Sequence, residues 1–325
     1  MKMNMNIRVN DYGAIEFAQG IPPSFTDYAI PQANISHAVG PFGTFIIQEV
    51  QTPTYLLRHF IFVVNQVLSF TIDENHYAIQ SLFSLKGDFK HKISTKQIVS
   101  IKESEFVLFR ADGHQDYSVL SPGKICSLFQ SYYTPSIYKD FLSSFPAFKQ
   151  DLKRAINKSV YFLFPGKVAR FSIHDTIHAF WLDKYIGELQ AKYIELRMVS
   201  TLFTMLAQTY SKTYGEAFSV QEREKSSDAL QLISSDITKH YTLTDIASQL
   251  HCSPTWLKKA FSKVYGIGMF HYLRKSRMGK ARQMLLAGEQ LKVVALEVGM
   301  KPRNFPKEFK AFYGYTVTAL KKGVI

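Results

Sequence analysis

The 325-residue sequence has little of several features that define common protein classes. It contains only two cysteines, Cys126 and Cys252, which excludes a disulfide framework or a cysteine-rich zinc module and favours a reducing compartment. Its most apolar run, residues 55–72, is interrupted by charged and amide side chains and cannot cross a bilayer as one helix. The first 17 residues lack an apolar stretch of signal-peptide length. We therefore expect a cytoplasmic protein that has no membrane partner.

Acidic side chains are scarce in the last third of the chain. From Asp228 to the end there are sixteen Lys and Arg against six Asp and Glu, a net charge of +10, whereas the first 227 residues carry +3. Hydrophobic residues make up 46% of the sequence and charged residues 20%, which excludes a wholly disordered chain. A basic, folded C-terminal third favours a polyanionic partner, either nucleic acid or an anionic membrane, although a merely solvated surface would have the same composition.

The same third contains an internal repeat with a period of 48 residues. Apolar, proline and glycine positions recur in register between the two copies. The aligned pairs are Ile246 with Val294, Ala247 with Ala295, Leu250 with Val298, Pro254 with Pro302, Leu257 with Phe305, Phe261 with Phe309, and Gly266 with Gly314. We therefore expect the same folding unit twice.

The first copy has the pattern of a helix-turn-helix. Residues 244–250 have the apolar spacing of a short helix, with Thr242 or Thr244 as its N-cap. Ser253 followed by Pro254 predicts the start of a second helix, because the Ser side chain satisfies orphan amides and Pro at the first position loses no helical bond. Two short helices joined by a three-residue turn match a DNA-binding helix-turn-helix, for which the alternative is a generic helical hairpin.

The second helix of each copy has an outward face suited to DNA. With Leu257, Phe261 and Val264 buried, a rotation of about 100° per residue turns polar and basic side chains outward. Lys and Arg can donate to guanine, Asn can pair with adenine, and a Thr methyl can pack on thymine. The candidate DNA-contacting residues are Thr255, Trp256, Lys258, Lys259, Ser262 and Lys263 in the first copy, Arg274 between the copies, and Arg303, Asn304, Lys307 and Lys310 in the second.

Residues 270–287, between the copies, predict one basic amphipathic helix. At 1.5 Å per residue its length is roughly 25 Å. Such a rod would hold the two recognition helices near the ~34 Å spacing of successive major grooves on one face of DNA. Among the candidate residues, we expect Lys263 and Arg274 to act through phosphates, weakening all DNA sequences alike when they are replaced.

With these features the sequence resembles the AraC/XylS family of bacterial transcription regulators. The resemblance rests on residues 245–266 for the first helix-turn-helix, on Arg277, Ala281 and residues 285–286 for the linker helix, and on residues 294–314 for the second unit. It implies a regulator that binds double-stranded promoter DNA through this domain and usually activates transcription by contacting RNA polymerase. It also implies an N-terminal portion that senses a small-molecule effector or forms a homodimer.

Pro306 is the main departure from a simple second recognition helix. A helix that began at Pro302 would contain Pro306 in its interior and lose a backbone bond there. A start with Asn304 as N-cap would place Pro306 harmlessly in the first turn. That start leaves open whether Arg303 and Asn304 read bases or contact phosphate, and the first recognition helix is the better candidate for base contacts.

The rest of the chain predicts an α+β protein of several domains. Residues 1–145 read as a β-rich effector or dimerisation domain, a sandwich or barrel, for which the resemblance implies a cupin-like or otherwise barrel-shaped fold. Residues 146–214 read as a helical connector and possible dimer contact, residues 215–227 as a charged linker, and residues 228–325 as the all-α DNA-binding domain with two helix-turn-helix units. The expected strands cover residues 42–48, 55–64, 76–85, 99–109 and 118–133.

Two other classes of protein have less support in the sequence than a DNA-binding regulator. His174 and His178 stand at i and i+4, as in a metal site, but lack the glutamate of zinc proteases and an obvious third ligand. The alternative function is thus a metal-binding or small-molecule-binding cupin with an incidental basic tail. An RNA-binding module would require an aromatic stacking motif that the sequence does not contain. With no phosphate-binding loop or nucleophile elbow, we expect no enzyme activity, metal or cofactor.

Overall fold

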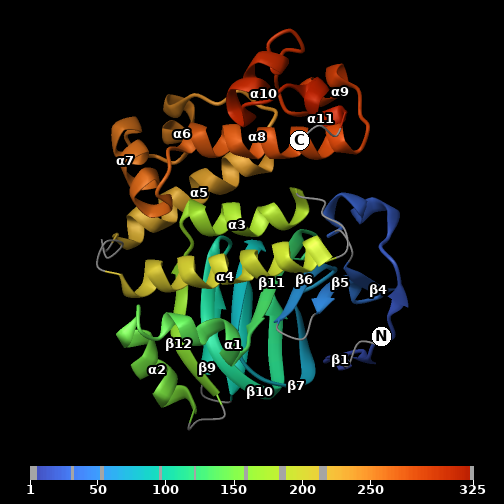
Figure 1. Ribbon diagram of the computed structural model, residues 1–325, viewed down its shortest axis with the longest axis vertical. Coiled ribbons are helices and arrows are strands. Elements are labelled where there is room, and N and C mark those ends of the chain that lie inside the picture. Colours follow the sequence, from blue (N-terminus) through green and yellow to red (C-terminus); the bar gives the residue numbers. More distant parts are fainter. Residues whose placement is uncertain are drawn as a thin grey trace. The chain divides into compact units, whose positions relative to one another are not determined.

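The computed structural model describes residues 6–30, 33–51, 55–94, 97–120, 122–156, 160–182, 188–211 and 218–322. The chain divides into two compact parts, an N-terminal unit, Met1–Glu216, and a C-terminal unit, Ala217–Ile325 (Figure 1). The N-terminal unit is β-rich with helices added, and every described element of the C-terminal unit is a helix. The expected α+β fold class is therefore confirmed.

The N-terminal unit is built on one antiparallel sheet. Its strands follow the order β3-β4-β5-β6-β11-β7-β10-β8-β9, with β1 pairing with β2 and β7, and β12 pairing with β10. The strands are β1 Asn6–Val9, β2 Gly13–Ala14, β3 Ala18–Gln19, β4 Asn34–Gly40, β5 Gly43–Gln51, β6 Tyr55–Val64, β7 Leu68–Lys86, β8 Phe89–Ser94, β9 Gln97–Ile101, β10 Glu105–Val119, β11 Ile125–Tyr133 and β12 Val160–Val168.

The sheet curls so that strands far apart in its order meet. Phe45 of β5 and Phe70 of β7 have ring centroids 5.3 Å apart, although β6 and β11 lie between these strands in the sheet. In a flat sheet, strands three places apart would be separated by about 14 Å. The concave side holds a core of strand and turn residues that includes Phe60, Phe62 and Phe109. The aromatic and β-branched side chains of these strands thus fill the interior of a curled, barrel-like sheet.

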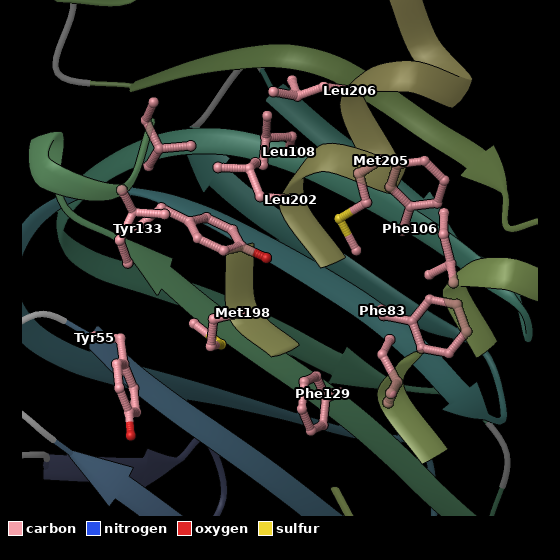
Figure 2. Packing of buried hydrophobic residues seen from close by; sticks show 14 of the residues in the cluster. Tyr55, Phe83, Phe106, Leu108, Phe129, Tyr133, Met198, Leu202, Met205 and Leu206 are labelled. Atoms are coloured by element: carbon pink, nitrogen blue, oxygen red, sulfur yellow. The ribbon is translucent and has the colours of Figure 1, made fainter. Parts of the chain in front are cut away.

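The opposite side of the sheet is covered by helices. The helices are α1 Pro135–Tyr138, α2 Pro146–Ile156, α3 Phe171–Leu182 and α4 Glu188–Tyr210, with short 3-10 turns at Pro23–Tyr28 and Lys139–Phe141. Figure 2 shows Met198, Leu202, Met205 and Leu206 of α4 directed at the aromatic and aliphatic side chains of the sheet. This face of α4 is therefore part of the core of the N-terminal unit.

The C-terminal unit contains seven helices within its described residues. They are α5 Val220–Ser235, α6 Leu243–Gln249, α7 Pro254–Tyr265, α8 Met269–Leu286, α9 Leu291–Glu297, α10 Phe305–Tyr313 and α11 Val317–Lys321. Within this unit α8 lies between the α6–α7 pair and the α9–α10 pair (Figure 1). No helix in the ranges given above is long and apolar enough to span a membrane.

Three local expectations differ from the structure. The expected helical connector contains strand β12, because apolar residues such as Leu163 complete the sheet beside β10. The expected linker is helical from Val220 onward, whereas residues 215–217 of it lie outside the described residues. The run 118–133 is two strands separated by a turn at Gly123, whose φ of 71° is a left-handed conformation that glycine adopts readily.

Candidate nucleic-acid interface

The first repeat copy folds as the two helices that the sequence predicts. The Oγ1 of Thr242 accepts from the amide of Asp245 at 3.1 Å and caps α6. The Oγ of Ser253 accepts from the amide of Trp256 at 3.2 Å and caps α7, with Pro254 in the first turn. These caps confirm the predicted helix starts, and they fix where each side chain of α7 points.

Helix α7 separates an apolar face from a polar face. Its buried residues are Leu257, Ala260, Phe261, Val264 and Tyr265. The side chains of Thr255, Lys258 and Lys259 are exposed, and those of Trp256 and Ser262 are half-buried. The first copy therefore presents a hydroxyl and two ammonium groups on one exposed helical surface, a combination that can donate to base edges or phosphates.

The second copy repeats the arrangement with one change at its turn. Phe305 and Phe309 are buried, while Lys307 and Lys310 are exposed. Helix α10 begins at Phe305 with Asn304 at the N-cap position, so Pro306 lies in the first turn as expected from the alternative start. The exposed Arg303 and Asn304 thus precede the helix.

The connecting helix α8 shares a hydrophobic core with the second copy. Met278, Ala281 and Leu285 of α8 pack with Val294, Phe305 and Phe309 of the second copy. The hydroxyl of Tyr313 also donates to the carbonyl of Met278 at 3.0 Å. The apolar side of the helix predicted for residues 270–287 therefore packs against the second motif.

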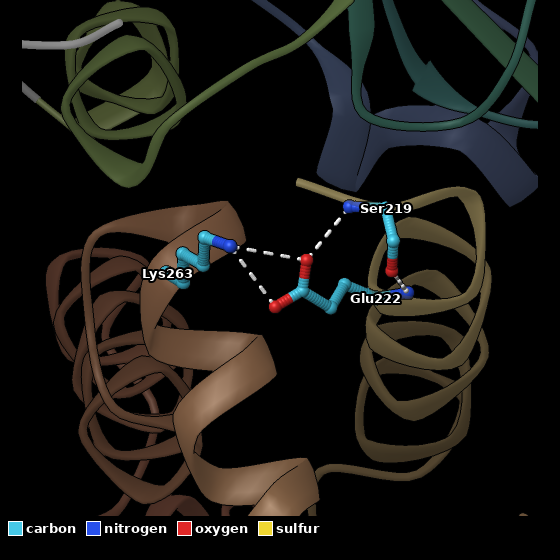
Figure 3. Close-up of polar contacts among 3 residues, drawn as sticks. All are labelled: Ser219, Glu222 and Lys263. Carbon is cyan, nitrogen blue, oxygen red and sulfur yellow. Dashed lines mark hydrogen bonds and ion pairs between the residues drawn. The ribbon is translucent and has the colours of Figure 1, made fainter. Parts of the chain in front are cut away.

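Two of the candidate cations are bound by carboxylates of other helices. Lys263 of α7 donates to both carboxylate oxygens of Glu222 in α5, each at 3.1 Å (Figure 3). Arg274 of α8 donates to Glu308 of α10 at 3.1 Å. Neither partner was among the residues that the sequence singled out, because the pairs are separated by 41 and 34 positions.

Glu222 also caps its own helix. Its Oε2 accepts from the amide of Ser219 at 2.7 Å, and its own amide donates to the Oγ of Ser219 at 3.1 Å. The Ser219 amide and then the Lys263 ammonium hold the pKa of the Glu222 carboxyl below its usual value. The spacing Ser-x-x-Glu is a sequence signature of such a capping box, and it is the signal that would have predicted the start of α5.

The histidines do not form a metal centre in the part of the chain that is described. His174 is buried, with its ring edge-on to Phe83 at 4.9 Å, and the side chain of His178 lies outside the described residues. His59 is hydrogen-bonded to Gln48 and Ser127. Among described residues no group of three or more His, Cys, Asp or Glu is placed to hold a metal ion.

Two of the comparisons match the C-terminal part of this chain. A family model described as "Helix-turn-helix domain" matches residues 246–323. The regulatory protein PocR of Salmonella typhimurium strain LT2 is 28% identical over 102 residues, which are 31% of this chain and 34% of PocR. The match therefore spans about a third of the length of that relative.

Two solved structures also resemble the chain. A DNA-binding transcriptional dual regulator from Escherichia coli K-12 is 29% identical, with a TM-score of 0.27, over 30% of this chain and 96% of that one. ToxT from Vibrio cholerae is 14% identical, with a TM-score of 0.32, over 82% of this chain and 98% of that one.

The matched segment coincides with the doubled motif. It begins at Ile246 in α6 and extends beyond α11, so it contains both helix pairs and the helix that joins them. The Ser253 cap, the repeated buried aromatics and the exposed cations of α7 and α10 all lie within it. The C-terminal unit therefore contains a doubled helix-turn-helix domain of the type found in AraC/XylS-like DNA-binding transcription regulators.

Proposed function

We propose that this protein is a sequence-specific regulator that binds double-stranded promoter DNA through α7 and α10. The observation that carries the proposal is the exposed surface of α7, where Thr255, Lys258 and Lys259 stand opposite a fully buried apolar face. A surface helix with this division can enter a major groove while its other side remains packed. Helix α10 offers the same division, with Lys307 and Lys310 outward.

The contacts divide into two kinds in this proposal. Thr255, Lys258, Lys259 and Ser262 of α7 read base edges or flank them, and Trp256 packs beside them. Arg303 and Asn304, in the turn before α10, are placed where phosphate contacts are natural, and Lys307 and Lys310 face the groove. Lys263 and Arg274 reach phosphates only by leaving their carboxylate partners, Glu222 and Glu308.

The N-terminal unit is proposed to make the DNA-binding activity conditional. As in the family, it would bind a small-molecule effector or pair two chains, and the protein would act in the bacterial cytoplasm as an activator that contacts RNA polymerase. What supports this proposal is the resemblance of the C-terminal unit to AraC/XylS-like regulators, together with a separate, well-packed β-rich unit on the same chain. Activation is tested with a reporter gene placed behind the bound promoter, in cells with and without the protein.

Selection of binding sites tests the DNA-binding proposal. The full chain is incubated with a library of duplexes that carry a random central segment, and bound duplexes are recovered and sequenced over several rounds. The proposal expects convergence on one asymmetric sequence with two conserved blocks about one helical turn apart, one block for each recognition helix. Recovery of unrelated sequences, or no retention of duplex DNA at low salt, would contradict it.

A further inference from the structure

The pair between Glu222 and Lys263 joins the first helix of the C-terminal unit to the first recognition helix. The ammonium of Lys263 sits between the two carboxylate oxygens at equal distances of 3.1 Å, in a forked contact (Figure 3). The side chains are 32% and 19% exposed, so the pair is better shielded than Arg274–Glu308 or Lys280–Glu297. Of these three pairs, Lys263–Glu222 is therefore the least screened by solvent.

The geometry of α7 places Lys263 on the DNA side of the helix. Lys263 follows the exposed Lys259 by four residues, which is about one helical turn, so both side chains leave the same side of α7. Lys259 remains exposed, whereas Lys263 turns toward α5. A lysine at this position would reach a phosphate beside the groove if its carboxylate partner were absent.

Glu222 is held in place independently of Lys263. Its Oε2 accepts from the amide of Ser219 at 2.7 Å while its amide donates back to the Ser219 hydroxyl. The start of α5 thus holds the carboxylate in place without help from Lys263. Helix α5 itself contacts α7, and it buries Ala229, Leu230 and Ile233 in the C-terminal unit. A fixed anion beside a recognition helix competes directly with the phosphates of DNA.

We propose that Glu222 is a positioning residue that withholds Lys263 from DNA phosphate and so lowers the affinity for duplexes of any sequence. This inference rests on the proposed DNA-binding function. Sequence-independent affinity comes almost entirely from cations that neutralise phosphates and release counter-ions. When Lys263 is paired with Glu222, the recognition surface has one cation fewer for phosphate. DNA binding then depends more on the base contacts of other α7 residues such as Lys259.

The test replaces Glu222 by glutamine in the full chain. Glutamine at the third helical position preserves the capping box, so α5 is expected to remain folded. With a duplex of random sequence about three turns long, E222Q should bind roughly five- to tenfold more tightly near 0.1 M salt. The slope of log K against log salt should become steeper by about 0.9, the signature of one additional phosphate contact.

Two further variants separate the ion pair from a general change of charge. Glu224→Gln removes the same charge from the same helix, at an exposed residue that has no ion pair among the described contacts, and should leave the slope unchanged. In a Lys263→Gln background, E222Q should have no effect on the slope, because the cation that it frees is gone.

The outcomes distinguish this inference from the function on which it rests. Wild-type protein that ignores duplex DNA at low salt overturns the proposed function. Wild-type protein that binds, while E222Q shows the same affinity and the same slope, overturns the inference alone. An E222Q effect that persists in the Lys263→Gln background also overturns it, because the effect then does not pass through the ion pair.

Discussion

The Nε of Arg277 donates a hydrogen bond of 2.6 Å to the carbonyl oxygen of Ile237. The same guanidinium donates to the carbonyl of Lys239 at 2.8 Å. One side chain of α8 thereby fastens the loop between α5 and α6. Gly299, which follows α9, approaches the carbonyl of Thr238 in the same loop. The loop therefore lies between the connecting helix and the second motif, and these contacts tie the two helix-turn-helix motifs together.

Loss of the hydrogen bonds from Arg277 to this loop should destabilise the C-terminal unit. Arg277→Ala leaves the partly buried carbonyl of Ile237 and the exposed carbonyl of Lys239 without their donor, and we expect the free energy of unfolding to fall by about 1–3 kcal/mol. Urea unfolding followed by the fluorescence of Trp256, in a Trp181→Phe background, measures this unit separately. Arg277→Lys, which keeps the charge and one donor group, should lose less. Equal stability of the alanine variant and the parent would refute the structural role.

Two glycines in left-handed conformations should respond differently to alanine. Gly314 has a φ of 82° and open space where an alanine Cβ would lie, so Gly314→Ala should cost about 1–2 kcal/mol through backbone strain alone. Gly299 has a φ of 67°, and a Cβ there would collide with the backbone of Thr238. Gly299→Ala should therefore lower the free energy of unfolding by clearly more than Gly314→Ala in the same urea experiment. The reverse order would show that the loop does not press against Gly299.

His91 should make the N-terminal unit sensitive to acid. Its ring stacks on Tyr117 at 4.5 Å, and burial lowers its pKa to about 3 against the opposing effect of a hydrogen bond with Gln115. Between about pH 6.5 and pH 3 the unfolded chain binds a proton that the folded chain does not. Stability is therefore lost as the pH falls through this window, by up to about 1.4 kcal/mol per pH unit.

A variant without the titrating ring isolates this effect. His91→Phe keeps an aromatic ring beside Tyr117 and removes the proton site, so its stability should change less between pH 7 and pH 5. Unfolding in urea, followed by the fluorescence of Trp181 in a Trp256→Phe background, gives the two slopes. Identical pH dependence in both proteins would mean that His91 is not the group responsible.

Lys259 should contribute directly to affinity for the selected DNA site. Its side chain is exposed on the polar face of α7, and Lys259→Ala should weaken binding to that site by about 1–3 kcal/mol, with the folded stability unchanged. Lys153→Ala, an exposed charge on α2 of the N-terminal unit, provides the matched loss of one positive charge. Competition binding on the selected duplex compares them, and an equal loss in both variants would remove Lys259 from the base-reading set.

The sequence predicted the C-terminal unit well because its signals are local. Ser253 with Pro254 marks a helix start by short-range chemistry, and the repeat places Phe261 and Phe309 in equivalent buried positions. Even the displaced start of α10 followed from Pro306, since proline restricts the backbone at its own position.

Features that depend on contacts between residues far apart in the chain could not be predicted from the sequence. Lys263 looked like a free phosphate contact because nothing near it in the chain shows that Glu222 reaches it. Strand β12 lies in a segment that was expected to be helical. Its partner strand β10 is about fifty residues earlier in the chain, so no local pattern indicates the pairing. The charged residues after Ser219 resembled a linker, although a capping box and a buried face at Ala229 and Ile233 make them helical.

A footprint of the full chain on its selected duplex tests the central claim most directly. Base-level protection from chemical modification should appear in two major-groove segments about one helical turn apart on one face of the DNA. Lys259→Ala should lose protection in the segment read by α7 and retain it in the other. Protection confined to a single segment, or spread over both faces of the duplex, would contradict the account of two recognition helices acting on one DNA surface.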